Sequence, residues 1–205
     1  MGEKKMLSIL KEQERDVRRN LILDAAERLF SANSFDKVSM QEIANEAQLS
    51  KSSIYTYFQN QEELFIEAAL RDGAILQTSL LKMTERKDST IENVIDAFIE
   101  FFVNHDSFFR MASLLMLQGN LSEESIAKVH PVIRGVMEVF DTVIRRMNYR
   151  GDVRLLSHTL FSALSGILIS YRNYPSRTES EKMRHMKRLG TTVRDMVKAL
   201  IKTRK

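Results

Sequence analysis

The stretch from Ser39 to Phe58 reads SMQEIANEAQLSKSSIYTYF and predicts two short helices joined by a tight turn. Ser39, followed three residues later by Glu42, fits a capping box at the start of the first helix, and Ser50 is suited to cap the second. This is the spacing of a helix-turn-helix, whose two helices share a small core. The positions that we expect in this core are Ile43, Ala44, Ala47, Leu49, Ile54 and Phe58.

The outer face of the second helix is polar. Hydroxyl groups, a lysine and free backbone N–H groups at a helix N-terminus suit the phosphates and base edges of a DNA major groove. A capped helix on a solvated surface would carry the same residue types, so the pattern alone leaves both interpretations open. The residues that we expect to face outward are Lys51, Ser52, Ser53, Tyr55, Thr56 and Tyr57.

The rest of the chain also predicts helices. Only two prolines and seven glycines occur in 205 residues, which favours long helices and short turns, and apolar residues recur at spacings of three and four. Pro131 falls inside one predicted helix, which should kink or restart there. Cap pairs that mark helix starts are Ser39/Glu42, Asn60/Glu63, Ser89/Glu92 and Thr178/Glu181.

We therefore predict an all-α protein of about nine helices and no strand. Helices two and three are too short to be stable alone, so they must pack against the first as a three-helix unit. We expect this unit at residues 1–60 and a larger helical domain at residues 61–205. The predicted helices span about 14–32, 39–46, 50–57, 61–83, 90–104, 106–118, 122–147, 152–173 and 179–203.

The segment from Ile22 to Leu64 resembles the DNA-binding signature of the TetR family of transcriptional regulators. The resemblance covers about a fifth of the chain and implies a homodimer that binds a palindromic double-stranded DNA operator, most often as a repressor, and releases it on binding a small ligand. It also implies that residues 61–205 bind this ligand and form the dimer. The matching positions are Ala25–Ala26, Leu29–Phe30, Ile43–Ala44, Ser50, Ile54–Tyr55, Phe58, Glu62 and Leu64.

The resemblance assigns roles to individual residues of the DNA-binding segment. It implies that Arg18 and Arg19 contact flanking phosphates and that Ser50 opens the recognition helix. It places Lys51, Ser52, Ser53 and Thr56 near the bases, and Ser39, Tyr55, Tyr57 and Gln61 near the DNA backbone.

Three positions depart from the family pattern. Ser34 and Gln48 stand where the family usually has glycine, so we expect both in left-handed conformations at a cost of about 1–2 kcal/mol each. Gln61 stands where the family usually has lysine, which removes a charge that would contact a phosphate.

A cluster of large apolar side chains in the second domain predicts a ligand pocket. Five phenylalanines fall between Phe98 and Phe109, and adaptable methionines suit a cavity for an apolar or amphipathic effector. Ordinary core would have the same composition; the resemblance favours a pocket. The expected lining is Phe98, Phe102, Phe109, Met111, Met116, Phe140 and Phe161, with His105, Arg110, Gln118 and His158 as polar candidates beside it.

The last two helices predict a dimer interface. The segment LFSALSGILISY, from Leu160 to Tyr171, is apolar almost all round, which implies burial on two sides, and the final helix carries one apolar stripe. Together they are typical of half a four-helix interface. The residues that we expect in it are Leu160, Leu164, Ile167, Leu189, Val193 and Val197.

The charge distribution gives no support to DNA binding by itself. Net charge is +4, but residues 1–70 hold nine Lys and Arg against twelve Asp and Glu. The basic residues concentrate in residues 182–205, where a nucleic-acid or membrane patch is one interpretation and the solvated face of an amphipathic helix is the other.

Several function classes find no support in the sequence. There is no cysteine, the four histidines lack metal-ligand spacing, and no catalytic or nucleotide-binding fingerprint is present, so we expect no metal, no cofactor and no enzyme. We see no signal peptide and no apolar stretch long enough for a membrane, which predicts a cytoplasmic protein. A helical enzyme using the apolar cavity and a ligand-independent DNA binder or activator remain as alternatives.

Overall fold

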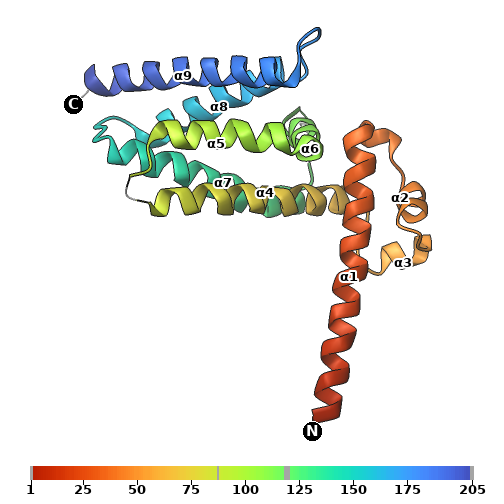
Figure 1. Cartoon of the computed structure of the whole chain (residues 1–205). Helices are drawn as coiled ribbons and strands as arrows, with labels where there is room; N and C mark the ends of the chain where they lie inside the picture. Colours follow the sequence, from red (N-terminus) through yellow and green to blue (C-terminus); the bar gives the residue numbers. More distant parts are fainter. Residues whose placement is uncertain (1, 87, 118–120, 204–205) are drawn as a thin grey trace.

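The computed structural model describes residues 2–86, 88–117 and 121–203, with side chains from residue 5 onward, and it confirms the all-α prediction. The described residues form nine α-helices and a short 3-10 helix, Phe35–Lys37, and contain no strand (Figure 1). The helices are α1 Gly2–Ala32, α2 Met40–Glu46, α3 Lys51–Tyr55, α4 Gln61–Glu85, α5 Ile91–Asn104, α6 Asp106–Leu117, α7 Glu123–Arg146, α8 Val153–Tyr171 and α9 Glu179–Thr203.

The first helix begins much earlier than predicted. It starts at Gly2 rather than near residue 14. Residues 5–16 are rich in Glu, Lys, Arg, Gln and Leu, which favour helix intrinsically, but all of them are exposed and so lack the buried stripe on which the prediction relied. The predicted end of the sixth helix, at residue 118, lies outside the described residues.

Three of the four predicted caps are confirmed. The Ser39 N–H donates to Glu42 Oε2 at 2.7 Å, Asn60 Oδ1 accepts from the Glu63 N–H at 2.8 Å, and the Thr178 N–H donates to Glu181. The pair Ser89/Glu92 is wrong by one residue. The cap is Thr90, whose N–H donates to Asn93 Oδ1 at 2.9 Å, because the asparagine side chain can reach back as a glutamate does.

Of the kink or restart predicted at Pro131, the restart is wrong. Helix α7 continues through this residue from Glu123 to Arg146. Proline leaves the carbonyl of Ala127 without its usual donor, but Ala127 and Pro131 are both exposed, so water can replace the lost hydrogen bond.

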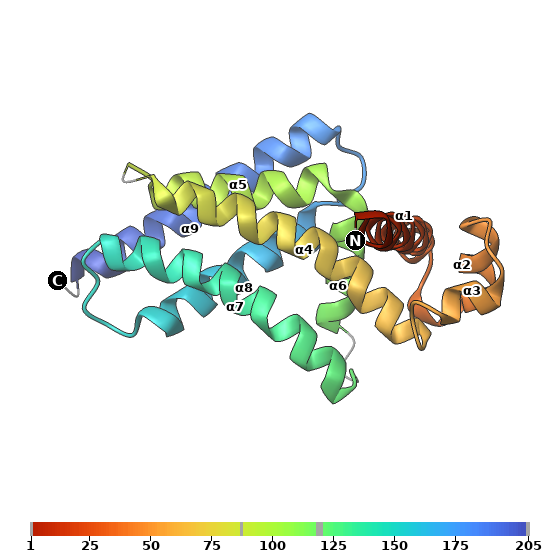
Figure 2. The same cartoon turned by 90° about the horizontal axis from the view of Figure 1, so that it is seen from below.

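The helices pack around two clusters of buried side chains. One joins α1, α2, α3 and the first turns of α4, around Phe30, Ile54 and Phe65. The other lies among α4 to α9, around Phe98 and Phe140. Figures 1 and 2 show α1 standing across the body of the molecule, with α2 and α3 on its outer side and α4 running from this unit into the body beside α7. Because α4 contributes to both clusters, it connects them.

Helix α8 is long and apolar enough to cross a membrane by length and composition alone, contrary to the expectation that no stretch of the chain would be. In the structure it packs against α7 and α9 instead, with Leu160 and Leu164 at most 1% exposed. A polar contact also holds it in place: Ser157 Oγ donates to the fully buried Asp141 of α7 at 2.6 Å, and Arg154 pairs with the same carboxylate at 2.9 Å.

Candidate functional site

The turn between α2 and α3 has the geometry of a Schellman motif. The N–H of Leu49 donates to the carbonyl of Ala44 at 2.9 Å and that of Gln48 to Asn45 at 3.1 Å, as this motif requires. Gln48 has φ of 56°, so its predicted left-handed conformation is confirmed. For Ser34 the prediction is wrong: its φ of −65° and ψ of 148° are extended, because it caps the 3-10 helix rather than ending α1.

Helix α3 presents part of the predicted DNA-contacting set. Ser50 caps it and accepts from the Ser53 N–H at 3.1 Å. Tyr57 is half-buried against the first core cluster, as is Ser53 within its own turn. The Thr56 hydroxyl donates to the carbonyl of Ser53 at 2.7 Å, and the Ser39 hydroxyl to Glu42 at 2.8 Å. The most exposed side chains on this helix and its end are Lys51, Ser52, Tyr55 and Thr56.

The predicted flanking contacts fall into two kinds. Arg18 is exposed and pairs with Glu14 one turn earlier at 2.7 Å. Arg19 instead joins α1 to α4 through Glu67 at 2.8 Å and lies over the ring of Phe58. Gln61 donates from Nε2 to the carbonyl of Phe35 at 2.7 Å. Arg19 and Gln61 therefore hold the three-helix unit on α4, whereas Arg18 is open to a partner.

A cavity of about 290 Å³ opens in the second domain between α4, α5, α6, α7 and α8. Four of the seven predicted residues line it, namely Phe98, Phe102, Met116 and Phe161. The other lining residues, outside that set of seven, are Ala69, Leu70, Gly73, Leu76, Phe108, Ala112, Leu115, Leu121, Ile126, Val129, His130, Val132, Ile133 and Val136.

The other three predicted pocket residues do not line this cavity. Phe140 lies behind Phe98, with ring centroids 5.8 Å apart, and Phe109 packs edge-on to Phe102. Met111 belongs to the first core cluster and is 1% exposed, because it sits where α6 meets α1. Richness in large apolar side chains predicted the region but could not separate the wall from what lies behind it.

The cavity is almost entirely apolar. His130 is the one polar side chain in its described lining, and this residue is exposed near Ile126 and Ile133, which are about half exposed. The polar candidates His105, Arg110 and His158 do not line it, and Gln118 lies outside the described residues. The cavity can therefore hold an apolar group, with a polar group at its mouth beside α7.

The predicted dimer residues pack into this chain's own core rather than on its surface. Leu160, Leu164, Ile167 and Val197 are buried in this chain's own core, and Leu189 and Val193 pack half-buried against it. A helix that is apolar all round does not reveal which side its own core takes. The exposed residues on α8 and α9 include the large apolar side chains of Leu155, Ile169 and Met196 and the small residues Ser162 and Gly166.

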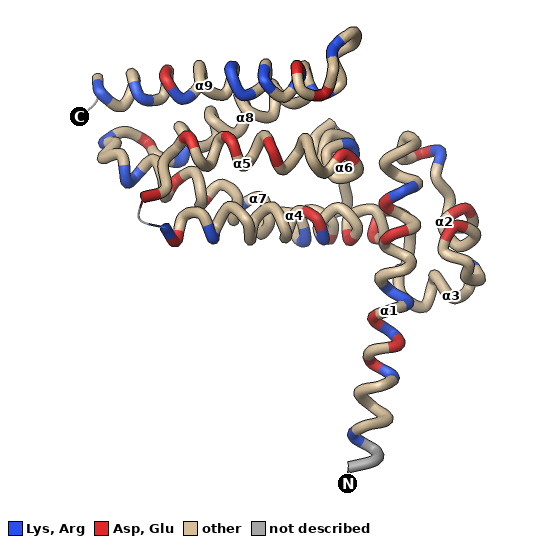
Figure 3. Tube along the Cα trace, viewed as in Figure 1, with Lys and Arg blue, Asp and Glu red and all other residues tan. Residues whose placement is uncertain are grey.

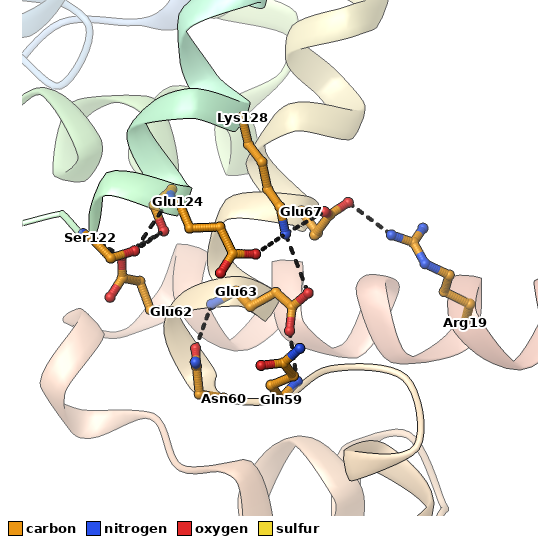
Figure 4. Close-up of polar contacts among 10 residues, drawn as sticks. Arg19, Gln59, Asn60, Glu62, Glu63, Glu67, Ser122, Glu124 and Lys128 are labelled. Carbon is orange, nitrogen blue, oxygen red and sulfur yellow. Dashed lines mark hydrogen bonds and ion pairs between the residues drawn. The ribbon is translucent and has the colours of Figure 1, made fainter.

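Polar contacts join the start of α7, at the cavity mouth, to the start of α4 (Figure 4). Glu62 Oε1 accepts from the Ser122 N–H at 2.8 Å, from its hydroxyl at 2.7 Å and from the Ser125 hydroxyl at 2.5 Å. These hydrogen bonds, that of Ser125 above all, lower the pKa of the Glu62 carboxyl. We call this set the α4–α7 junction.

An ionic cluster extends the α4–α7 junction along the same two helices. Lys128 of α7 lies 3.3 Å from Glu63, 3.4 Å from Glu67 and 3.2 Å from Glu124. Since Glu67 also binds Arg19 of α1, polar contacts run continuously from α7 to the three-helix unit. Among the described residues, no group of His, Asp and Glu side chains could hold a metal ion.

Comparison with known proteins gives the same assignment for the N-terminal domain. Residues 22–68 match the model of the bacterial regulatory proteins of the tetR family. An HTH-type transcriptional regulator of Haemophilus influenzae, whose name describes it as uncharacterized, is 30% identical over 109 residues, which are 52% of this chain. The match spans 53% of that relative, about half its length.

Solved structures share the fold of the whole chain. The transcriptional regulator FadR of Bacillus subtilis, solved in complex with stearoyl-CoA, gives a TM-score of 0.72 at 17% identity, over 86% of this chain and 96% of that one. The TetR-family regulator PfmR of Thermus thermophilus gives 0.64 at 25% identity, over 82% and 92%. The helix-turn-helix and residues 22–68 therefore match the tetR family of bacterial regulatory proteins, and the whole chain has the all-helical fold of solved transcriptional regulators of this kind.

Proposed function

We propose that the chain is a cytoplasmic repressor that binds a palindromic DNA operator as a homodimer and is released when a small apolar or amphipathic ligand enters the cavity. Residues 1–60 bind DNA and residues 61–205 bind the ligand and the second subunit. The observation that carries this proposal is the α4–α7 junction, which connects α7 beside the cavity to the first turn of α4 through Glu62 and Ser125.

DNA binding rests on the outer face of α3. Lys51, Ser52 and Tyr55 are exposed there and carry the donors that read phosphates and base edges in a major groove. Two copies must present this helix about 34–36 Å apart to enter successive major grooves. The exposed faces of α8 and α9, including Gly166 and Ile169, supply a surface on which two copies could pair.

For the ligand we propose a molecule with one long apolar chain and a polar head. The apolar cavity would take the chain, and the exposed His130 would lie beside the head at the mouth. The similarly folded B. subtilis regulator is described in complex with stearoyl-CoA, a molecule of this kind. Ligand at the mouth would shift the first turns of α7, and through Glu62 it would tilt α4 and change the spacing of the two α3 helices.

The experiment that tests this function is a binding titration with duplexes that tile the DNA upstream of the protein's own coding sequence. We expect wild type to bind one of these duplexes, and Lys51→Ala to bind the same duplex at least tenfold more weakly. The control is Lys202→Ala, which removes an exposed lysine far from α3, at the end of α9. Equal binding of all three proteins to every duplex would contradict the assignment of α3.

A further inference from the structure

Helix α1 continues beyond the helices that it supports. Every described side chain from residue 5 to residue 18 is exposed, and Arg19 is the first that is half-buried. Figure 1 shows this part of the helix passing α3 and continuing away from the rest of the molecule. We call residues 5–18 the N-terminal overhang.

One side of the overhang is basic. Lys11, Arg15 and Arg18 follow one another at spacings of four and three, so they lie on one face of the helix. The same row continues with Ile22 and Ala25, which are fully buried in the core shared with α2 and α3. The row is therefore apolar where it packs against the helix-turn-helix and basic where it emerges beside it, and Figure 3 shows basic residues along this segment.

The other sides of the overhang differ in character. Glu12 and Asp16, four residues apart, lie about a quarter turn away from the basic row. The exposed Leu10 and Val17 lie on a third side. Glu14 pairs with Arg18, but an exposed ion pair of this kind contributes little free energy, so a phosphate can replace the carboxylate. Positive charge is thus concentrated along the row that, further on, packs into the core shared with α2 and α3.

We propose that Lys11, Arg15 and Arg18 bind the phosphate backbone of the double-stranded DNA that flanks the half-site contacted by α3. The inference rests on the proposed DNA binding by α3. From Lys11 to Arg18 the helix rises about 10 Å, enough for successive phosphates of a duplex. The row also supplies positive charge to a DNA-binding domain that is otherwise poor in it. Residues 1–70 are net acidic, and Gln61, which replaces the family's lysine, donates to Phe35 within the chain.

The test measures affinity against NaCl concentration, on the upstream duplex whose binding depends on Lys51. Each phosphate neutralised contributes about −0.9 to the slope of log K against log salt. We expect Lys11→Gln/Arg15→Gln to bind at least tenfold more weakly at low salt and to make the slope shallower by about 2. Lys5→Gln removes a charge from another side of the same overhang. Its affinity for the duplex should stay within twofold of that of wild type.

A second experiment repeats the titration with a duplex whose flanking base pairs have been removed. We expect wild type to fall to the affinity of the double variant, and the double variant to lose nothing further. The proposal is overturned if the double variant equals wild type on the long duplex while Lys51→Ala still abolishes binding. It is also overturned if Leu10→Asp/Val17→Asp lowers the molecular mass without DNA while the basic row has no effect on DNA binding, since the overhang would then join copies of the chain. If no duplex shows Lys51-dependent binding, the proposed function itself fails.

Discussion

Glu62, in the first turn of α4, accepts a hydrogen bond of 2.5 Å from the hydroxyl of Ser125 in α7, and the same carboxylate oxygen accepts two more from Ser122. Ser122 is the N-cap of α7, so the Glu62 carboxylate lies at the positive end of this helix, where negative charge is stabilising. One carboxylate therefore ties the helix at the cavity mouth to the helix that carries the DNA-binding unit.

The first prediction concerns coupling through this contact. Ser125→Ala removes the shortest of the three hydrogen bonds while the cavity lining and α3 stay unchanged, so we expect near wild-type affinity for DNA but a ligand-induced release reduced at least fivefold. Anisotropy of labelled upstream duplex, titrated with stearoyl-CoA, measures both quantities. The control is Ser113→Ala, which removes the hydroxyl of a half-buried serine on α6. Unchanged release in Ser125→Ala would show that the junction does not transmit the signal.

The second prediction concerns acid. A carboxyl whose folded pKa is lowered stabilises the fold above its unfolded pKa, about 4.3 for glutamate, and loses this contribution as pH falls through the lowered folded value. The pKa of Glu62 is lowered by Ser125 and Ser122. We therefore expect the Tm of Glu62→Gln to lie below that of wild type at pH 7 and to approach it below pH 4. Glu123→Gln, in the first turn of α7, controls for the loss of a charge. A Tm difference that is constant from pH 7 to pH 3 would refute this.

The third prediction uses the two positions where the family usually has glycine. Gln48 is left-handed, so Gln48→Gly relieves about 1–2 kcal/mol of strain against about 0.4–1 kcal/mol of added unfolded-state entropy. We expect a net gain of about 0.5–1 kcal/mol in the free energy of unfolding. Ser34 is extended, so Ser34→Gly should lose stability instead. Urea denaturation measures the free energy of unfolding of both variants. Changes of the same sign would contradict the left-handed conformation of Gln48 and the extended one of Ser34.

The fourth prediction concerns the dimer. Ile169 is 49% exposed on α8, so Ile169→Asp should weaken dimerisation at least tenfold, about 1.4 kcal/mol, while the chain stays folded. Leu81→Asp, at a position 38% exposed on α4, should leave the dimer intact. Analytical ultracentrifugation with circular dichroism tests both. A wild-type dissociation constant for Ile169→Asp would exclude this face of α8 from the interface.

Local features of the sequence predicted much of the fold. The caps at Ser39 and Thr178 and the turn at Gln48 depend on residues within five positions of one another, so their pattern was sufficient. Ser34 failed because the loop after α1 forms a 3-10 helix, which changes the role of the residue before it. The early start of α1 was missed because a helix that packs against nothing leaves no apolar periodicity to detect.

Features that depend on how helices meet were harder to predict. Helix α7 contributes Ile126, His130 and Ile133 to the cavity lining, and nothing local to these residues indicates that α7 would lie across the cavity from α6. Leu164 and Ile169 belong to the same apolar helix, but Leu164 is buried in the chain's own core and Ile169 is exposed. The partner of Glu62 could not be foreseen either, because Ser125 is 63 residues away in the chain.

The measurement that most directly tests the account is release of the upstream duplex by stearoyl-CoA in wild type and in Ala112→Phe. Ala112 lines the cavity, so a phenylalanine there should fill part of it, whereas Ala74→Phe places the same side chain on the exposed side of α4. We predict that wild type and Ala74→Phe release the DNA as ligand is added. Ala112→Phe should respond at least tenfold more weakly, either staying bound or failing to bind from the outset. Equal release from all three proteins, or no release from wild type by any long-chain ligand, would contradict the claim that this cavity controls DNA binding.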